Sequence, residues 1–265
     1  MSLLAMALAA PGADAGPVAQ VPPGSVVRWP GEGIDSCAMG KRSWTPLDGS
    51  CFYAVDLLRG EGPVDLVRTR EGRRESVSIR VGAYTYPVQK LTLPREKVDL
   101  SPESLARVQR ESRDIGRLWG RAGERQFTLP LHPPLDPLPE GGRFGSRRII
   151  NGQPKSPHSG ADYSAAAGEP ILAVADGVVA LAAEHFFAGN SVFLDHGDGL
   201  ISMYFHMRRM NVQEGESVRR GQVIGEVGAT GRVTGPHLHF GLRWHRARID
   251  PALLLGDPEG LPEIR

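Results

Sequence analysis

The sequence predicts a mainly β protein, with a β-rich unit on either side of a single helix. The chain has 33 glycines and 22 prolines, which make up about 21% of its 265 residues against a usual level of roughly 12%. Short apolar blocks separated by turn residues recur in both halves, and only one stretch has helical spacing. Since Gly and Pro cost about 1 and 3 kcal/mol inside a helix, few long helices fit this composition.

Residues 1–25 have the composition of an export leader followed by a spacer. Leu3–Ala10 is an apolar, alanine-rich run, and Ala13-Asp14-Ala15 resembles a small-residue cleavage site. The basic start of a secretory signal peptide is missing, because the first basic residue is Arg28. The run is shorter than the roughly 20 apolar residues of a membrane span, so we expect an exported chain with no membrane span in its mature form.

Residues 26–98 are predicted to form a small β-sandwich. Turn pairs such as Asp48-Gly49 and Glu71-Gly72 separate short strand-like blocks. These blocks are Ser25–Trp29, Cys51–Leu58, Val64–Arg70, Glu75–Val81 and Tyr84–Leu93.

The only two cysteines, Cys37 and Cys51, lie in this predicted sandwich. Two cysteines without a nearby histidine do not supply four zinc ligands. A disulfide, which would imply an oxidising compartment, is favoured over a pair of unrelated buried thiols.

A helix is predicted over 101–119, within a helical segment spanning 99–126. Ser101 suits the N-cap, Pro102 the first helical position and Gly120 the position after the last turn. Apolar residues form one stripe, and five arginines recur at spacings of three and four. Those arginines either bind an anionic polymer or form a solvated face paired with neighbouring acids, and we favour the solvated face. They are Arg107, Arg110, Arg113, Arg117 and Arg121.

Residues 127–141 contain five prolines and are predicted to be an extended connector. The chain then changes character. Between His158 and Asp250 there are two prolines but 13 glycines, which predicts a second, antiparallel β domain over 142–256, followed by a tail at 257–265. Its expected strands are Ile171–Asp176, Val178–Ala183, Ser191–Asp195, Ile201–His206, Gln222–Val227 and His237–Trp244.

Seven of the eight histidines follow residue 157, and four of these fall into three patterns. These patterns are His158-Ser-Gly-Ala-Asp162, Tyr204-Phe-His206-Met and Gly235-Pro-His237-Leu-His239-Phe. Side chains two apart on a strand share a face, so His237 and His239 project together. Two histidines and one carboxylate can supply the three protein ligands of a catalytic zinc site that keeps one position open. The remaining histidines, His132, His185, His196 and His245, are expected to be non-catalytic.

Taken together, these motifs resemble the lysostaphin/LytM-type zinc metallopeptidases, which cleave peptide bonds in bacterial peptidoglycan. The resemblance covers about 140–256. It extends to Phe144-Gly145, Arg147-Arg148, Asn151-Gly152, Gly168–Ala173, Gly228-Ala-Thr-Gly231 and Gly215-x-x-Val-x-x-Gly-x-x-Ile-Gly225. It implies an antiparallel β barrel-sandwich for the catalytic domain. Residues 26–126 also resemble, more loosely, the Ig-like domain and helix of a cell-envelope subgroup.

The resemblance implies that His158, Asp162 and His239 bind one Zn²⁺ per chain. It implies that His206 and His237 perform acid–base and transition-state work, and the sequence does not say which of them is the base. Candidates to line the substrate cleft are Tyr204, Asn151 and Thr230. Strand alternation predicts that Tyr204 lies on the same face as His206, with core packing as the equal alternative.

Other functions fit less well. A net charge of +1 argues against a nucleic-acid partner. A lipoyl or biotin carrier needs a lysine at a hairpin tip, and all four lysines precede His158. A serine hydrolase lacks its Gly-x-Ser-x-Gly elbow. The main alternative is a LytM-type module without activity that binds or activates another wall hydrolase. The expected partners are peptidoglycan stem peptides in the periplasm and a regulatory envelope protein, for which the N-terminal domain is a docking or restraining candidate.

Overall fold

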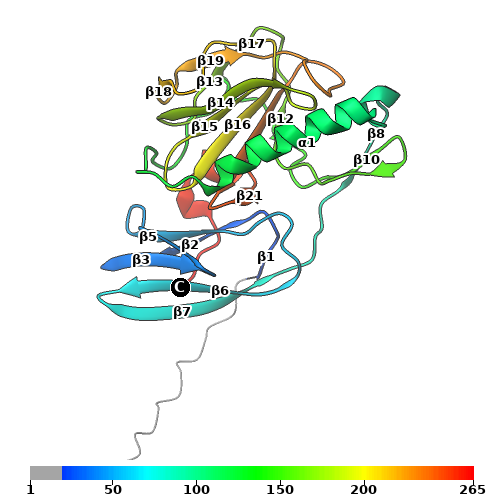
Figure 1. Cartoon of the computed structure of the whole chain (residues 1–265). Helices are drawn as coiled ribbons and strands as arrows, with labels where there is room; N and C mark the ends of the chain where they lie inside the picture. Colours follow the sequence, from blue (N-terminus) through cyan, green and yellow to red (C-terminus); the bar gives the residue numbers. More distant parts are fainter. Residues whose placement is uncertain (1–19) are drawn as a thin grey trace, which may run out of the picture.

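The expected mainly β fold is confirmed in the computed structural model, which describes residues 20–265. A lower β unit and an upper β unit lie one above the other, and helix α1 crosses the upper one (Figure 1). The predicted leader falls almost entirely in residues 1–19, outside the described residues.

The lower unit is a sandwich of two sheets. Its larger sheet follows the order β1 (Gln20–Val21), β7 (Arg73–Val81), β6 (Gly62–Arg70), β3 (Ile34–Met39), β4 (Arg42–Trp44). The smaller sheet pairs β2 (Val26–Pro30) with β5 (Ser50–Ala54) in antiparallel register. Cys37 on β3 and Cys51 on β5 form a disulfide that ties the two sheets together.

Segment Tyr84–Leu93 does not join this sandwich. Its central part, β8 (Val88–Leu91), runs parallel to β10 (Arg147–Ile150) of the upper unit, which also pairs with β11 (Gln153–Pro154). The expectation that this block is a strand of the N-terminal sandwich is therefore wrong. Its pairing partner lies about 60 residues along the chain, and local patterning carries no information about such a contact.

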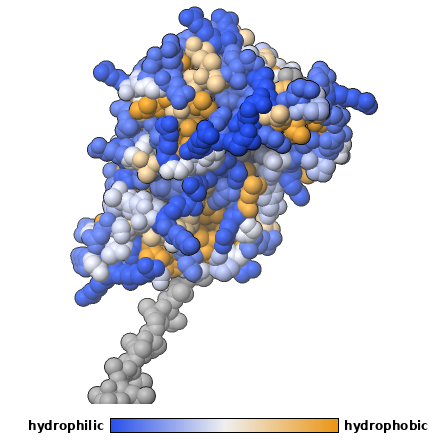
Figure 2. Space-filling view, viewed as in Figure 1, coloured by the Kyte–Doolittle hydropathy of each residue, from blue (hydrophilic) through white to orange (hydrophobic). Residues whose placement is uncertain are grey.

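Helix α1 (Pro102–Gly116) and the 3₁₀ turn η2 (Arg117–Gly120) occupy the predicted helical segment, after a short turn η1 (Arg95–Lys97). The Ser104 N–H donates to Ser101 Oγ at 3.2 Å, which is the expected N-cap. Hydrophilic residues dominate the side of the molecule on which α1 lies (Figure 2), and α1 has no fully buried residue. Three of the five arginines in the predicted helical segment form ion pairs, in agreement with a solvated face: Arg107–Glu111, Arg117–Asp114 and Arg121–Asp195. Among residues 20–265 no helix is both long and apolar enough to cross a membrane.

The upper unit is built on one large antiparallel sheet. Its order is β18 (Ser217–Val218), β14 (Gly177–His185), β15 (Gly189–Asp195), β16 (Leu200–Met207), β20 (Leu238–Trp244), β12 (Ala161–Tyr163), β9 (Gly141–Gly142), with β21 (Ala247–Ile249) also on β20. A smaller sheet, β13 (Pro170–Leu172), β19 (Val223–Glu226) and β17 (Arg209–Met210), packs against one face. The apolar core lies between these two sheets and contains Ile171, Ile224, Tyr204 and Phe240.

The proline-rich connector is part of this core and does not merely span two domains. Leu131 and Leu135 are each only 1% exposed. Phe127 packs on Trp244 from one side and Phe52 of the lower unit packs on it from another. The two units therefore share one core, which the connector helps to fill.

The chain's end also joins the two units. After α2 (Ala252–Leu255) and η3 (Pro258–Gly260), the predicted tail returns to the lower unit (Figure 1). Ile264 is 7% exposed in the core of the sandwich, and Arg28 pairs with Glu263 at 3.1 Å.

The disulfide closes a loop with a sequence separation of 14 residues. Replacing both cysteines (Cys37→Ala/Cys51→Ala) is expected to lower the free energy of unfolding of the lower unit by about 3 kcal/mol, because the unfolded chain regains the entropy of that loop. Trp29 and Trp44 lie in the same core, so their fluorescence during urea unfolding reports the change. Dithiothreitol should destabilise the wild type similarly and leave the variant unaffected, and equal urea midpoints for the two proteins would contradict the prediction.

Candidate metal centre and cleft

Three neighbouring strands of the large sheet position the candidate ligands. The antiparallel register sets Asp162 of β12 opposite His239 of β20, and His239 opposite Phe205 of β16. Residues directly opposite each other on adjacent strands have their Cβ atoms about 4.5–5.5 Å apart on one face. The backbone alone therefore brings Asp162 and His239 together. His158 comes from the segment just before β12, where its backbone N–H donates to the Ser146 carbonyl.

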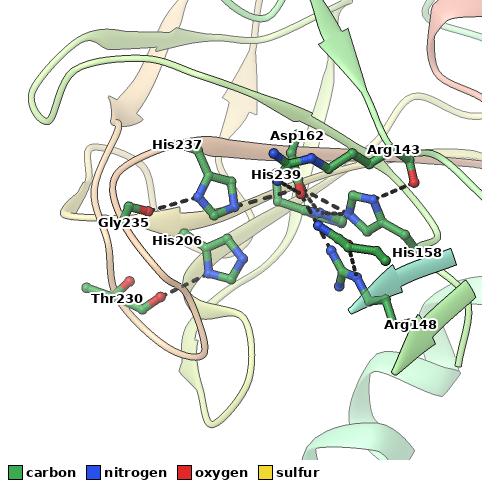
Figure 3. Close-up of polar contacts among 10 residues, drawn as sticks. Arg143, Arg148, His158, Asp162, His206, Thr230, Gly235, His237 and His239 are labelled. Atoms are coloured by element: carbon green, nitrogen blue, oxygen red, sulfur yellow. Dashed lines mark hydrogen bonds and ion pairs between the residues drawn. The ribbon is translucent and has the colours of Figure 1, made fainter. Parts of the chain in front are cut away.

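The three side chains converge on one point (Figure 3). His158 Nε2 lies 2.8 Å from His239 Nδ1 and 3.0 Å from Asp162 Oδ1. His239 Nδ1 lies 2.9 Å from the same Asp162 oxygen. Within residues 20–265 this is the one group of three or more metal-ligating side chains whose donor atoms approach so closely.

The chemistry of this donor set fits a divalent cation. His158 Nδ1 lies 2.9 Å from the Arg143 carbonyl oxygen, so its N–H donates there and Nε2 presents a lone pair to the group. Burial lowers the pKa of His239 to about 4 despite its carboxylate neighbour, which leaves that ring neutral at pH 7. The buried rings of His158 and His239 and the Asp162 carboxylate thus point three potential metal-ligand atoms at one another. A cation between them satisfies the remaining lone pairs, and nitrogen and oxygen donors of this kind suit zinc.

Asp162 is held as a carboxylate by its neighbours. Burial alone would raise the pKa of Asp162, but its interactions with His158 and His239 hold that pKa well below its usual range. Its second oxygen, Oδ2, lies 3.5 Å from Arg148 Nη2 and 3.8 Å from Arg143 Nη1. The arginines therefore orient the carboxylate so that Oδ1 faces the histidines.

The imidazole of His239 is fixed from two sides. Phe205 stacks on it with ring centroids 5.1 Å apart and an interplanar angle of 11°. Gly160 lies against its other edge, since a Cβ at residue 160 would meet His239 Nε2 at 2.7 Å and the Phe240 carbonyl oxygen at 2.5 Å. The glycine within the His158-x-Gly-x-Asp162 motif is thus required by close packing against a ligand.

His206 reaches the site through a β-bulge in β16. The partners of Tyr204 and Met207 on β15 are Val192 and Asn190, so Phe205 and His206 together occupy one position of the ladder. His206 has φ +66°, a left-handed conformation that costs a residue with a Cβ roughly 1–3 kcal/mol. A bulge of this kind re-aims the side chain that follows it. The expectation that Tyr204 and His206 share a face is therefore wrong.

Tyr204 instead faces the core. It is 0% exposed, packs against Phe240, and its hydroxyl oxygen accepts a hydrogen bond from the Val174 N–H at 3.0 Å. It lines neither hollow of the cleft described below, so the core-packing alternative holds.

His206 and His237 form a second pair of imidazoles beside the ligand group, with ring centroids 4.9 Å apart. Each is oriented by a backbone carbonyl: His206 Nδ1 lies 2.9 Å from the Thr230 oxygen, and His237 Nδ1 lies 2.9 Å from the Gly235 oxygen (Figure 3). Burial, together with the nearby His239 and His237, lowers the pKa of His206 to about 3. His206 is therefore neutral at pH 7, with Nε2 free to accept a hydrogen bond.

The other two predicted cleft residues act through the backbone or lie to one side. The Thr230 carbonyl orients His206, and the Thr230 hydroxyl stabilises the bulged strand. This hydroxyl donates to the Met207 carbonyl at 2.8 Å and accepts from the Asn190 N–H at 3.0 Å. Asn151 makes two hydrogen bonds with the backbone of Leu93 and lines neither hollow of the cleft.

Two hollows of about 420 and 430 Å³ flank the metal group. Arg148, His206 and Arg232 border both of them, so the two hollows meet at the site. The first hollow is walled by Gln89, Leu91 and Leu93 from in and around β8, and the second is walled partly by Val98 and Leu100. The segment that leads from the lower unit to α1 therefore forms one side of the cleft.

Sequence reasoning found the five histidine and aspartate positions but gave no role to three other residues. Arg148 and Gly160 lie within motifs of the family resemblance, and Arg232 lies between two of these motifs. A signal for Arg232 was available, since it is a cation in a glycine-rich loop that directly precedes the His237-x-His239 pair. The remaining histidines take part in other contacts: His185 with Ser191, His196 with Ser202, His245 between Trp44 and Trp244, and His132 with Pro133.

Gly160→Ala is expected to weaken Zn²⁺ binding by about 10-fold or more, because the added methyl displaces the His239 ring from the ligand group. Competition with a chromophoric chelator measures the affinity. Gly60→Ala is the matched control, since no atom lies within 4 Å of the methyl group that it adds. Unchanged affinity in Gly160→Ala would show that the backbone relaxes without moving His239.

Comparison with known proteins agrees with this geometry. Residues 156–251 match the model of Peptidase family M23, a range that contains all five histidine and aspartate positions. Two curated relatives are the peptidoglycan DD-endopeptidase ShyC of Vibrio cholerae, 45% identical over 123 residues, and the DD-carboxypeptidase/endopeptidase Mpg of Neisseria meningitidis, 42% identical over 103 residues. The matches cover 46% and 38% of this chain but only 28% and 24% of those relatives, so the chain spans less than a third of their length.

A solved structure, a putative peptidase M23 from Pseudomonas aeruginosa, resembles nearly the whole molecule. It is 31% identical with a TM-score of 0.68, and the alignment covers 89% of this chain and 95% of that one. Since sequence and fold agree across both β units as well as around the metal group, the protein belongs to peptidase family M23.

Proposed function

We propose that this chain is a zinc-dependent endopeptidase that hydrolyses peptide cross-links of bacterial peptidoglycan and acts in cell-wall remodelling. The observation that carries this proposal is the convergence of a complete His-Asp-His ligand group with two further imidazoles at the junction of two hollows. A peptide that lay across both hollows would pass directly over these five side chains.

The relatives support the substrate class. Two from Vibrio cholerae are named peptidoglycan DD-endopeptidases, and the one from Neisseria meningitidis is named a DD-carboxypeptidase/endopeptidase. We therefore propose a D-amino-acid cross-link, rather than a glycine bridge, as the bond that this chain cuts. A LytM-type module without activity is not favoured, because all five ligand and acid–base positions are present and meet at one place.

The site's own residues divide the acid–base work. When bound by His158, Asp162 and His239, zinc supplies Lewis acidity, which favours deprotonation of water and polarises a carbonyl at neutral pH. His206 is neutral, with its Nδ1–H held by the Thr230 carbonyl, so its Nε2 accepts the proton of the attacking water. His237 Nε2 lies 3.7 Å from Asp162 Oδ1, beside the ligand group and next to His206, which places it to act as the acid toward the developing oxyanion or the leaving amine.

The compartment follows from the same proposal. A peptidoglycan hydrolase works outside the cytoplasm, and the disulfide between Cys37 and Cys51 fits an oxidising environment. We propose the cell envelope, with the periplasm as its compartment. A regulatory envelope protein that docks on the lower unit would act on the cleft through the segment around β8, which forms one of its walls.

Two histidine variants separate the proposed roles. His206→Ala is expected to keep one zinc per chain and to lose at least about 100-fold in the rate of peptidoglycan hydrolysis, because only the proton acceptor is removed. His239→Ala is expected to lose both zinc and activity. Elemental analysis and release of soluble fragments from purified peptidoglycan measure the two effects, with His132→Ala as a control outside the cleft. Equal zinc depletion in His206→Ala and His239→Ala would contradict the division of roles.

The bond that is cut can be identified directly. Zinc-loaded protein incubated with defined cross-linked muropeptides is expected to release the two peptides joined by the D-amino-acid cross-link, as read by mass spectrometry, and a chelator should abolish the reaction. Substrates joined by glycine bridges should remain intact. Cleavage of the glycine bridges alone would overturn the proposed bond, and a zinc-free protein that only stimulates another hydrolase would overturn the proposed activity.

A further inference from the structure

Arg232 is a cation at the centre of the cleft with no assigned role. It lies in the loop between β19 and β20 and borders both hollows, together with His206 and Arg148. Its position places it beside the bond that would be cut, whichever hollow holds each half of the substrate.

The side chain of Arg232 is held in place without an ion pair. Its guanidinium carbon lies 4.0 Å from the centre of the Phe187 ring, and its backbone N–H donates to the Phe187 carbonyl at 2.9 Å. Across the described part of the chain, no carboxylate lies within 4.0 Å of this guanidinium. Stacking on an aromatic face leaves the N–H groups at the edge of the guanidinium available for another partner.

The charges around Arg232 make an unpaired cation costly there. Burial, and next the positive charge of Arg148, lower the pKa of Arg232. Arg148 already forms an ion pair with Asp162 Oδ2, and the other oxygen of this carboxylate, Oδ1, belongs to the metal group. The residues that line the two hollows include Arg143, Arg148, Lys155 and Arg232 as cations but only Glu140 and Asp162 as anions, and a bound divalent metal adds further positive charge. The cleft therefore carries an excess of positive charge, which an anionic group of a ligand can balance.

We propose that Arg232 binds a free carboxylate of the peptide substrate next to the cleaved bond and thereby makes the enzyme selective for anionic cross-links. The proposal rests on the proposed function, since it names a group on that substrate. The planar guanidinium matches a carboxylate in two parallel hydrogen bonds, a geometry that the amide of an uncharged analogue does not reproduce. Stem peptides of peptidoglycan carry such carboxylates beside their cross-links, and modification to carboxamides removes the charge without changing the shape.

The test compares two cross-linked peptides that differ only in this group: one carries free carboxylates beside the cleaved bond, and the other carries carboxamides. Zinc-loaded wild type is expected to favour the carboxylate peptide by about 10- to 100-fold in kcat/KM. Arg232→Gln should lose this preference, mainly through KM for the carboxylate peptide, while its rate on the carboxamide peptide and its zinc content remain close to wild type. Arg232→Lys should retain part of the preference, since it keeps the charge but not the planar fork.

Two controls separate this site from a general effect. Arg219→Gln removes an exposed arginine that borders neither hollow, and it should leave the preference intact. Equal losses on both peptides in Arg232→Gln, or a wild type without preference, would overturn the carboxylate site. Such a result would assign Arg232 a structural role.

A binding measurement distinguishes this failure from failure of the proposed function. Calorimetry with the zinc-loaded His206→Ala variant measures the affinity for each peptide without turnover, and the carboxylate peptide is expected to bind about 10-fold or more tightly. The double variant His206→Ala/Arg232→Gln should bind both peptides alike. If the wild type cleaves neither peptide but the binding preference is present, the peptidase proposal fails and the carboxylate site stands; if the binding preference is absent, the carboxylate site fails.

Discussion

The register between β12, β20 and β16 is the constraint on which the site depends. It sets Asp162, His239 and Phe205 in one row across three strands, so that two ligands and the ring that stacks on one of them meet without any contribution from loops. A slip of one residue would turn each of these side chains to the opposite face, where Leu238 and Phe240 now fill the core. The apolar core and the metal group therefore require the same strand register, and both disfavour any shifted register.

The lower unit is more closely tied to the site than a separate domain would be. β8 extends the small sheet of β10 and β11 and walls one hollow, while Phe52 and the connector residue Phe127 both pack on Trp244 at the end of β20. The chain then ends inside the lower sandwich at Ile264. Movement of one unit against the other would expose part of a shared core, so any regulation through the lower unit acts on a cleft wall that is already in place.

The electrostatics of the cleft rest on a single carboxylate. Asp162 faces two histidines with one oxygen and two arginines with the other, while burial keeps His206 and His239 neutral. Neutral imidazoles suit ligands and proton acceptors, because a protonated ring can do neither. The positive charge of the site is therefore concentrated in its guanidinium groups and its metal, and both attract an anionic substrate.

The sequence by itself determined the mainly β class and the capped helix, since these depend on turn chemistry and on capping. Its histidine motifs, through their resemblance to a known family, also indicated which residues meet in the metal group. Tertiary structure decided where several side chains point. Regular alternation would keep His206 with Tyr204, but a bulge opposite β15 sends His206 to the cleft and leaves Tyr204 in the core. Likewise, β8 pairs with a strand about 60 residues away, and Arg232 meets both hollows. Local periodicity reports the backbone's regular repeat, whereas a bulge, a distant pairing and a shared cleft arise from contacts between segments that lie far apart in the chain.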